Sequence, residues 1–229
     1  MLEECAAVAA PERAGSDCVC TAVQVAIRWS VPHLRRAMYP REERPGSAAM
    51  TLRRQSENAP YAKFVENARW ERAGVIFGTL HVVGSNNNRR NDAAALSEYG
   101  ERNAANLAWI DAIFERARQT EARAVVLFFQ ANPFLRTPGS PSGFADTLDR
   151  LAQRARAYDR PVLLVHGDGH RLLIDQPLAV SGRRMNNVTR LMVFGDIEVH
   201  GVLVTVDSAS PDTFSYTPVV IPPNITPAE

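Results

Sequence analysis

Three short apolar runs separated by helix-like segments constrain the fold of this chain more than any other feature. Val75–Val83, Ala124–Phe129 and Pro161–Val165 are apolar on both faces and contain many β-branched or aromatic residues. Such runs are typical of central strands in a parallel sheet, where both faces are covered. We therefore expect a sheet built around these three strands.

The two segments between the runs have the spacing of amphipathic helices. Ser97–Ala122 follows the first run, and Phe144–Tyr158 follows the second. The apolar positions that share one face of the first segment are Leu107, Ile110, Phe114 and Ala117. Strands alternating with helices predict a sheet flanked by helices, so the fold class is α/β or α+β.

The pattern changes after His170, where strand-like stretches follow one another without helices between them. These stretches are Arg171–Asp175, Thr189–Phe194, Val199–Val206 and Phe214–Val220. We expect them to form a second, antiparallel sheet beside the first. Near the other end, Met50–Gln55 predicts a short strand and Trp70–Gly74 predicts a turn.

Residues 1–45 differ from the rest of the chain. They contain all three cysteines and lack a clear hydrophobic period. Cys18 and Cys20 lack the two-residue spacer of a zinc or redox pair, so we assign these thiols no role. The sequence predicts a poorly ordered arm at 1–45, a domain at 46–222 and a flexible tail at 223–229.

Composition and charge narrow the range of partners. A net charge of +1 argues against a dedicated nucleic-acid surface, which needs a concentrated basic face. No apolar run reaches the roughly 18 residues that a membrane span needs. The start, Met1–Glu4, is acidic where a secretory signal is basic, so the default expectation is cytoplasmic. The oligomeric state is not constrained.

Polar residues follow each of the three expected strands. They lie in Gly84–Asn88, Gln130–Pro133 and His166–His170. Ligand sites of parallel sheets lie beyond the carboxyl ends of the strands, so these segments are expected to meet at one site. In His166–His170, alternate glycines allow close backbone approach, and imidazole and carboxylate are common metal ligands. The residues alone indicate a metal- or phosphate-handling site.

Structural interpretations of the same segments stay open at this point. His166–His170 could be a glycine-rich turn with solvated polar groups, and Gln130–Pro133 a simple strand-to-loop turn. Gly84–Asn88 could present amides to a phosphate or be a polar surface loop. His81, inside an apolar run, is better explained as a hydrogen-bonded core histidine.

Six segments, in order, resemble the calcineurin-like metallophosphoesterases, specifically a bacterial branch. They are Phe64–Trp70, Gly78–Asn88, Arg102–Phe114, Phe128–Pro133, Pro161–His170 and Asn186–Asp196. The likeness runs from about Met38 to Pro222. It implies a four-layer αββα sandwich with a two-metal centre that hydrolyses a phosphoester substrate.

The resemblance also implies ligands. Gly167–His170 matches the family's last block, G-H-x-H, with Asp168 in place of the first histidine. Asp168 and His170 would then bind metal, and Gln130 stands where the family has a lone histidine. An amide oxygen is a poorer ligand than imidazole for late transition metals. This favours manganese or magnesium over iron or zinc, or a compromised second site.

Three further residues receive roles from the resemblance. His166 would be a supporting catalytic group that orients the substrate. Asn86 and Arg102 would contact its phosphate.

The family's first three ligand blocks are D-x-H, G-D-x-x-D and G-N-H-[DE], and none occurs in residues 1–37. We therefore expect an incomplete sandwich that lacks its N-terminal half, as in a truncated gene product. Two hypotheses follow. The chain is a metal-dependent phosphoesterase, or it is a non-catalytic remnant that binds a metal weakly or associates with a partner. We favour phosphoesterase ancestry with the behaviour of a remnant.

Overall fold

A computed structural model describes residues 51–135, 141–195, 200–207, 210 and 213–222. The chain divides into two units, Met1–Ser47 and Ala48–Glu229, and every described residue belongs to the second. The predictions for the arm at 1–45 and the tail at 223–229 concern residues outside this description. No helix within the described ranges is long and apolar enough to cross a bilayer.

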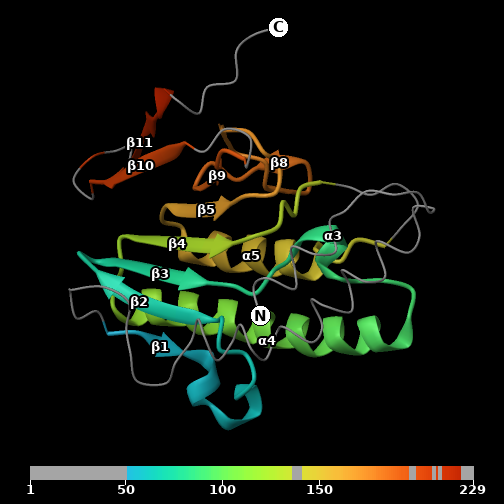
Figure 1. The fold of residues 1–229 in the computed structure, drawn as a ribbon. Helices are drawn as coiled ribbons and strands as arrows, with labels where there is room; N and C mark the ends of the chain where they lie inside the picture. The colour runs from blue at the N-terminus through green and yellow to red at the C-terminus, as the bar shows by residue number, and fades with distance from the viewer. Residues whose placement is uncertain (1–50, 136–140, 196–199, 208–209, 211–212, 223–229) are drawn as a thin grey trace, which may run out of the picture. The chain divides into compact units, whose positions relative to one another are not determined.

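A seven-stranded mixed sheet forms the centre of the described unit (Figure 1). In spatial order its strands are β1 (Arg53–Arg54), β2 (Ala68–Arg72), β3 (Val75–Thr79), β4 (Ala124–Phe129), β5 (Val162–His166), β9 (Val188–Met192) and β6 (Leu173–Asp175). Strands β3, β4, β5 and β9 are parallel, whereas β1, β2 and β6 pair antiparallel at the edges. The mixed α/β class and the three central strands are confirmed, and the four-layer sandwich stays a prediction.

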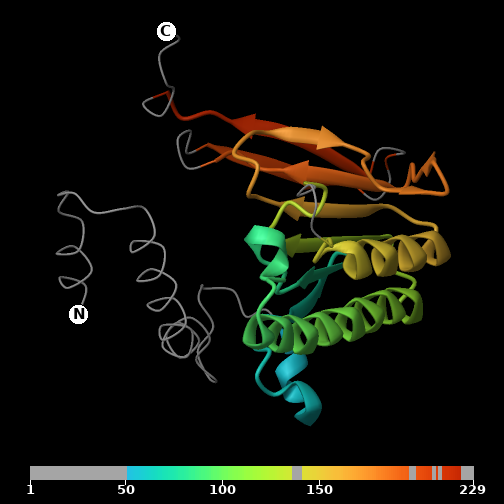
Figure 2. The ribbon, with the colours of Figure 1, turned by 90° about the vertical axis from the view of Figure 1, so that its right-hand side faces the viewer.

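Two long helices, α4 (Ala93–Gln119) and α5 (Ala145–Tyr158), lie on the same face of this sheet (Figure 2). The Asp92 side chain caps α4 by accepting a hydrogen bond from the Ala95 amide at 2.8 Å. The side chains between helices and sheet are almost completely buried: Ile76, Leu127, Leu164, Ile110, Ile113 and Leu151 are 0–1% exposed. Both predicted helices are confirmed, with ends that differ by a few residues.

Short elements complete this part of the fold. Two 3₁₀ turns, η1 (Gln55–Glu57) and η2 (Ala59–Tyr61), follow β1, and the single turn α3 (Gly84–Asn87) follows β3. Strands β7 (Ala179–Val180) and β8 (Arg183–Arg184) pair with each other as a small hairpin.

The opposite face of the sheet is covered in part by the antiparallel hairpin of β10 (Gly201–Val206) and β11 (Phe214–Val219). Alternate residues of the hairpin pack toward a cluster that includes Leu163 and Leu191. The predicted second antiparallel sheet is therefore right only for these two strands. Strand β9 instead pairs in parallel with β5 because it is buried on both faces, and β6 joins β9.

The turn predicted at Trp70–Gly74 is a second correction. Ala68–Arg72 forms strand β2, and the turn itself is Ala73–Gly74, where both residues have positive φ. Trp70 stacks on Phe77 of β3 with ring centroids 5.4 Å apart. This cross-strand aromatic pair stabilises the hairpin, and the local turn signal did not reveal it.

Candidate functional site

The loops after β3, β4 and β5 meet at the carboxyl end of the parallel strands. Gln130 Oε1 accepts a hydrogen bond from the Gly84 amide at 2.6 Å. Gln130 Nε2 lies 3.5 Å from Asp168 Oδ1, and Asp168 Oδ2 accepts from the Asn132 amide at 3.0 Å. The structure therefore brings together two of the predicted metal ligands, Gln130 and Asp168, and both are exposed to solvent.

The turn after β5 has an unusual backbone. Asp168 and His170 have φ angles of 69° and 54°, in the left-handed region that few non-glycine residues adopt. A Cβ atom at Gly169 would overlap the Met192 sulfur, so the buried Met192 side chain would have to shift to admit a larger residue. One of the two glycines in this turn is thus explained by close packing against β9.

His170, the third predicted ligand, is exposed and has other neighbours. It lies against Gly195, whose backbone follows β9, whereas Asp168 contacts the loop after β4. Within the described ranges, no three His, Cys, Asp or Glu side chains come together as a metal-binding group. Ligation by Asp168, His170 and Gln130 stays a prediction.

His166 is a core residue on the helix-covered side of the sheet, only 2% exposed. Its ring stacks on Phe129 at 5.5 Å and lies near Phe134 at 6.3 Å. Nδ1 lies 2.8 Å from the Gly167 carbonyl oxygen, to which it can donate, and Nε2 has no hydrogen-bond partner in the described part of the chain. Burial lowers the pKa of His166, which favours the neutral ring. This position suits packing, and the substrate-orienting role stays a prediction.

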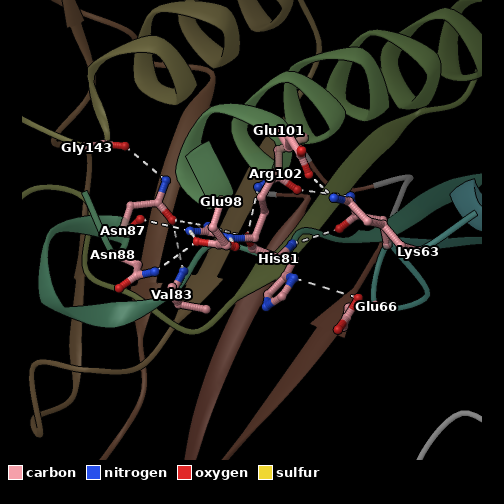
Figure 3. A network of polar contacts seen from close by, with 12 residues as sticks. Lys63, Glu66, His81, Val83, Asn87, Asn88, Glu98, Glu101, Arg102 and Gly143 are labelled. Carbon is pink, nitrogen blue, oxygen red and sulfur yellow. Dashed lines mark hydrogen bonds and ion pairs between the residues drawn. The ribbon is translucent and has the colours of Figure 1, made fainter. Parts of the chain in front are cut away.

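Arg102 lies inside a polar network rather than on the surface (Figure 3). It is 1% exposed and donates five hydrogen bonds, to the side chain of Glu98, to the His81 carbonyl, and to the side chain and carbonyl of Asn87. A guanidinium has five N–H groups, so a phosphate contact would require breaking one of these bonds. The structure therefore favours a positioning role for Arg102.

The electrostatics of Glu98 reflect the same network. Partial burial acts to raise the pKa of this carboxyl group, but hydrogen bonds from Arg102 and Asn88 outweigh it, and the pKa is lowered. Glu98 is therefore ionised when it pairs with Arg102.

The Asn86 side chain also forms hydrogen bonds with the protein backbone. Its Oδ1 accepts from the Gly143 amide at 2.7 Å and its Nδ2 donates to the Pro141 carbonyl at 3.1 Å. Ser85, Asn86, Asn87 and Asn88 all have φ between 52° and 57°, which asparagine tolerates better than most residues. The asparagine run thus forms a left-handed turn that attaches residues 141–143, and the predicted phosphate contact by Asn86 stays a prediction.

The pairing of His81 with Glu66 was not found from the sequence. His81 Nδ1 lies 3.7 Å from Glu66 Oε2, and the two side chains are 23% and 16% exposed (Figure 3). The His81 amide donates to Asn67 Oδ1 at 2.8 Å. His81 is thus partly exposed beside a carboxylate, not enclosed in the core. Nothing in the sequence pattern indicates that Glu66 lies next to it.

The donor atoms determine which metals the site could hold. Asp168 and Gln130 offer oxygen atoms, which suit magnesium or manganese better than zinc. Magnesium commonly takes one or two carboxylates and completes its coordination with water and substrate oxygens. The described residues therefore fit part of such a site.

No protein-family model matches the chain, and no curated protein matches it.

Proposed function

We propose that this chain is metallophosphoesterase-like and retains part of a divalent-metal site for phosphoester hydrolysis. The observation that carries the proposal is the contact between Gln130 and Asp168 beyond the ends of the adjacent parallel strands β4 and β5. Ligand sites of such sheets form at this edge. The six segments that resemble the metallophosphoesterases support the same conclusion.

In this proposal each residue has a limited task. Asp168 and Gln130 supply oxygen ligands, and His170 supplies a third donor from the same turn as Asp168. A bound divalent cation would polarise a phosphoryl oxygen and stabilise the charge that develops on it. The protein orients the ligands: the Gly84 amide fixes Gln130, and the Asn132 amide fixes Asp168. Further ligands come from water and the substrate.

The roles of the three supporting residues are adjusted in the proposal. Arg102 and Asn86 hold the loops that carry the site, through the contacts described above. His166 supports the turn that follows β5 by its hydrogen bond to the Gly167 carbonyl oxygen. The chain would correspond to the C-terminal portion of an αββα sandwich, with the seven-stranded sheet as one of its two sheets.

A non-catalytic binding protein is the second candidate. The observation that favours it is that protein amides already engage the same oxygen atoms, since Gly84 donates to Gln130 and Asn132 to Asp168. A pair satisfied in this way can serve to join two loops without any ligand.

Calorimetric titration with Mn²⁺ tests the metal site. The wild-type chain should bind Mn²⁺, and Asp168→Ala, Gln130→Ala and His170→Ala should each weaken the binding. Asp149→Ala, which removes an exposed carboxylate from α5, is the matched control and should bind like wild type. A wild-type chain that takes up no Mn²⁺ would contradict the proposal.

Hydrolysis of bis-p-nitrophenyl phosphate in the presence of Mn²⁺ separates the two candidates. Turnover that is lost in Asp168→Ala and retained in Asp149→Ala supports the phosphoesterase. Mn²⁺ binding without turnover in the wild type supports the binding protein.

A further inference from the structure

A pocket of about 530 Å³ opens at the β1 edge of the described unit. Its walls come from β1, η1, η2, β2 and the middle of α4, which Figure 1 shows near one another. None of its lining residues belongs to the loops after β3, β4 and β5. The volume lies within the range of small-molecule sites. The residues that matter here are Arg53, Arg54, Glu57, Tyr61, Arg69 and Trp109.

One wall of the pocket is fixed by buried side-chain amides. Gln55, at the start of η1, is 3% exposed, and its Nε2 donates to the Ala105 carbonyl of α4 at 2.7 Å. Asn67 is fully buried and donates to both Gln55 Oε1 and Asn106 Oδ1, at 2.7 and 3.0 Å. This network ties η1 to α4, so the pocket is organised before any ligand arrives.

Guanidinium groups outnumber carboxylates among the described residues of the pocket lining: Arg53, Arg54 and Arg69 stand beside the carboxylate of Glu57. The Glu57 carboxylate already accepts a hydrogen bond from the Arg54 amide at 3.0 Å and lies 3.6 Å from Arg53 Nη1. Because this carboxylate lies beside Arg53, it cannot also neutralise Arg69, so this part of the described lining attracts anions.

Arg69 is the best-placed cation for binding. Its guanidinium lies over the Trp109 ring, 5.6 Å from the centroid, and Nη1 donates to the Ala112 carbonyl at 2.7 Å. Within the described residues it has no ion pair, because the neighbouring Glu71 is engaged by Arg116. Partial burial lowers the pKa of Arg69, and the positive charges of Arg116 and Arg53 act in the same direction. A bound anion would counteract both effects by placing a negative charge beside the guanidinium.

We propose that this pocket binds a small organic anion whose phosphate or carboxylate group contacts Arg69 and Arg53. The fork of an arginine guanidinium matches both groups in a bidentate geometry. The apolar part of the ligand lies against Tyr61, and the Trp109 ring supports the Arg69 guanidinium. The pocket shares no residue with the proposed metal site, so this inference goes beyond the phosphoesterase proposal and stands independently of it.

Calorimetry on the full chain in the presence of EDTA tests the pocket, with AMP, adenosine, inorganic phosphate and citrate as probes. AMP should bind at least about tenfold more tightly than adenosine, because only AMP carries the phosphate. Phosphate and citrate show whether a phosphate or a carboxylate group is preferred. No binding of AMP, phosphate or citrate, or equal binding of AMP and adenosine, would overturn the proposal.

Variants assign the binding to the pocket. Arg69→Gln should weaken the binding of the preferred anion by about tenfold. Arg53→Gln, at an exposed position, should weaken it by about threefold. Arg118→Gln removes the same charge from an exposed position near the end of α4 and should bind like wild type. Equal losses in all three variants would indicate a general charge effect and refute the site. If Arg69→Gln does not fold, Arg53→Gln against Arg118→Gln still decides.

The two proposals can fail separately. Asp168→Ala should retain anion binding in the pocket even where it has lost Mn²⁺. Loss of anion binding in Asp168→Ala would refute the pocket and leave the metal-site test unaffected.

Discussion

The two faces of the central sheet are covered in different ways. On one face, α4 and α5 bury the strand side chains almost completely, and Leu127 and Leu164 are 0% exposed. On the other, the β10–β11 hairpin packs beside a cluster whose rim, including Phe77 and Phe128, is only partly buried. Tertiary contacts on the first face come from neighbours in sequence, and those on the second from a segment at the other end of the described chain.

This difference shows how packing depends on the covering element. A helix that follows a strand directly can return over it at little entropic cost, which favours dense packing. A late hairpin covers only the strands it reaches, near β5 and β9. We therefore expect the helix face to contribute more to stability for each side chain.

Adjacent residues of β4 give the sharpest test. Leu127 points to the helix face and Phe128 to the hairpin face. Leu127→Ala should lower the free energy of unfolding by about 2–5 kcal/mol, because it removes buried methyl groups and leaves a cavity. Phe128→Ala should cost less, although its side chain is larger, because the ring already contacts solvent. Urea unfolding measures both, and a larger cost for Phe128→Ala would refute the contrast between the faces.

The buried guanidinium on the helix side should also matter strongly. Arg102→Met should cost about 2–4 kcal/mol, because the carbonyl and carboxamide oxygens that it satisfies lose their donors. Arg118→Met, at an exposed position on the same helix, is the matched control and should change stability by less than about 0.5 kcal/mol. Hydrogen exchange should become faster in the turn at 84–88 in Arg102→Met only. If Arg102→Met changed neither the stability nor the hydrogen exchange of the turn, the network would not hold this turn.

A smaller effect is expected where Ile113 of α4 packs against Gly78 of β3. A Cβ atom at Gly78 would lie 2.5 Å from Ile113 Cδ1. Gly78→Ala should cost about 1–3 kcal/mol through overpacking. The second substitution Ile113→Val, which shortens the opposing side chain, should make Gly78→Ala less costly than it is in the wild-type background. Thermal unfolding of the four proteins measures the coupling, and strictly additive effects would contradict the close contact.

The smallest effect is a pH dependence from His166. Burial holds its folded-state pKa below the ordinary value of 6.5, and the nearby Arg190 acts in the same direction. At pH values between the folded-state pKa and 6.5, the unfolded chain binds more protons than the folded chain, so the free energy of unfolding rises with pH. Wild type should lose stability relative to His166→Phe as the pH falls from about 7 to about 5. Parallel unfolding curves for both proteins across that range would show that His166 is not shielded from water.

Much of the helix face followed from the sequence. Apolar runs marked β3, β4 and β5, and the helical spacing identified α4 and α5 because both patterns are local. The spacing did not identify Trp109 and Ile113 as core residues, although both are buried. A buried stripe wider than the one defined by Leu107, Ile110, Phe114 and Ala117 would have included them.

The candidate site was predicted in part. The polar segments after the parallel strands were expected to meet, which placed Gln130 near Asp168. This expectation is general, because the carboxyl ends of parallel strands lie at one edge of the sheet. The direction of the His170 side chain and the enclosure of Arg102 depend on contacts with other segments of the fold. The same is true of the pocket at β1, whose three arginines lie in different elements from Trp109.

The sequence by itself determined the alternation of the three central strands with two helices and the edge where their polar loops meet, because hydrophobic period and strand direction are properties of the chain itself. The tertiary structure alone decided that β9 joins the main sheet while β10 and β11 cover its other face. It also decided that Arg102 and Asn86 hold loops, since whether a polar side chain meets solvent or protein acceptors depends on packing between distant segments.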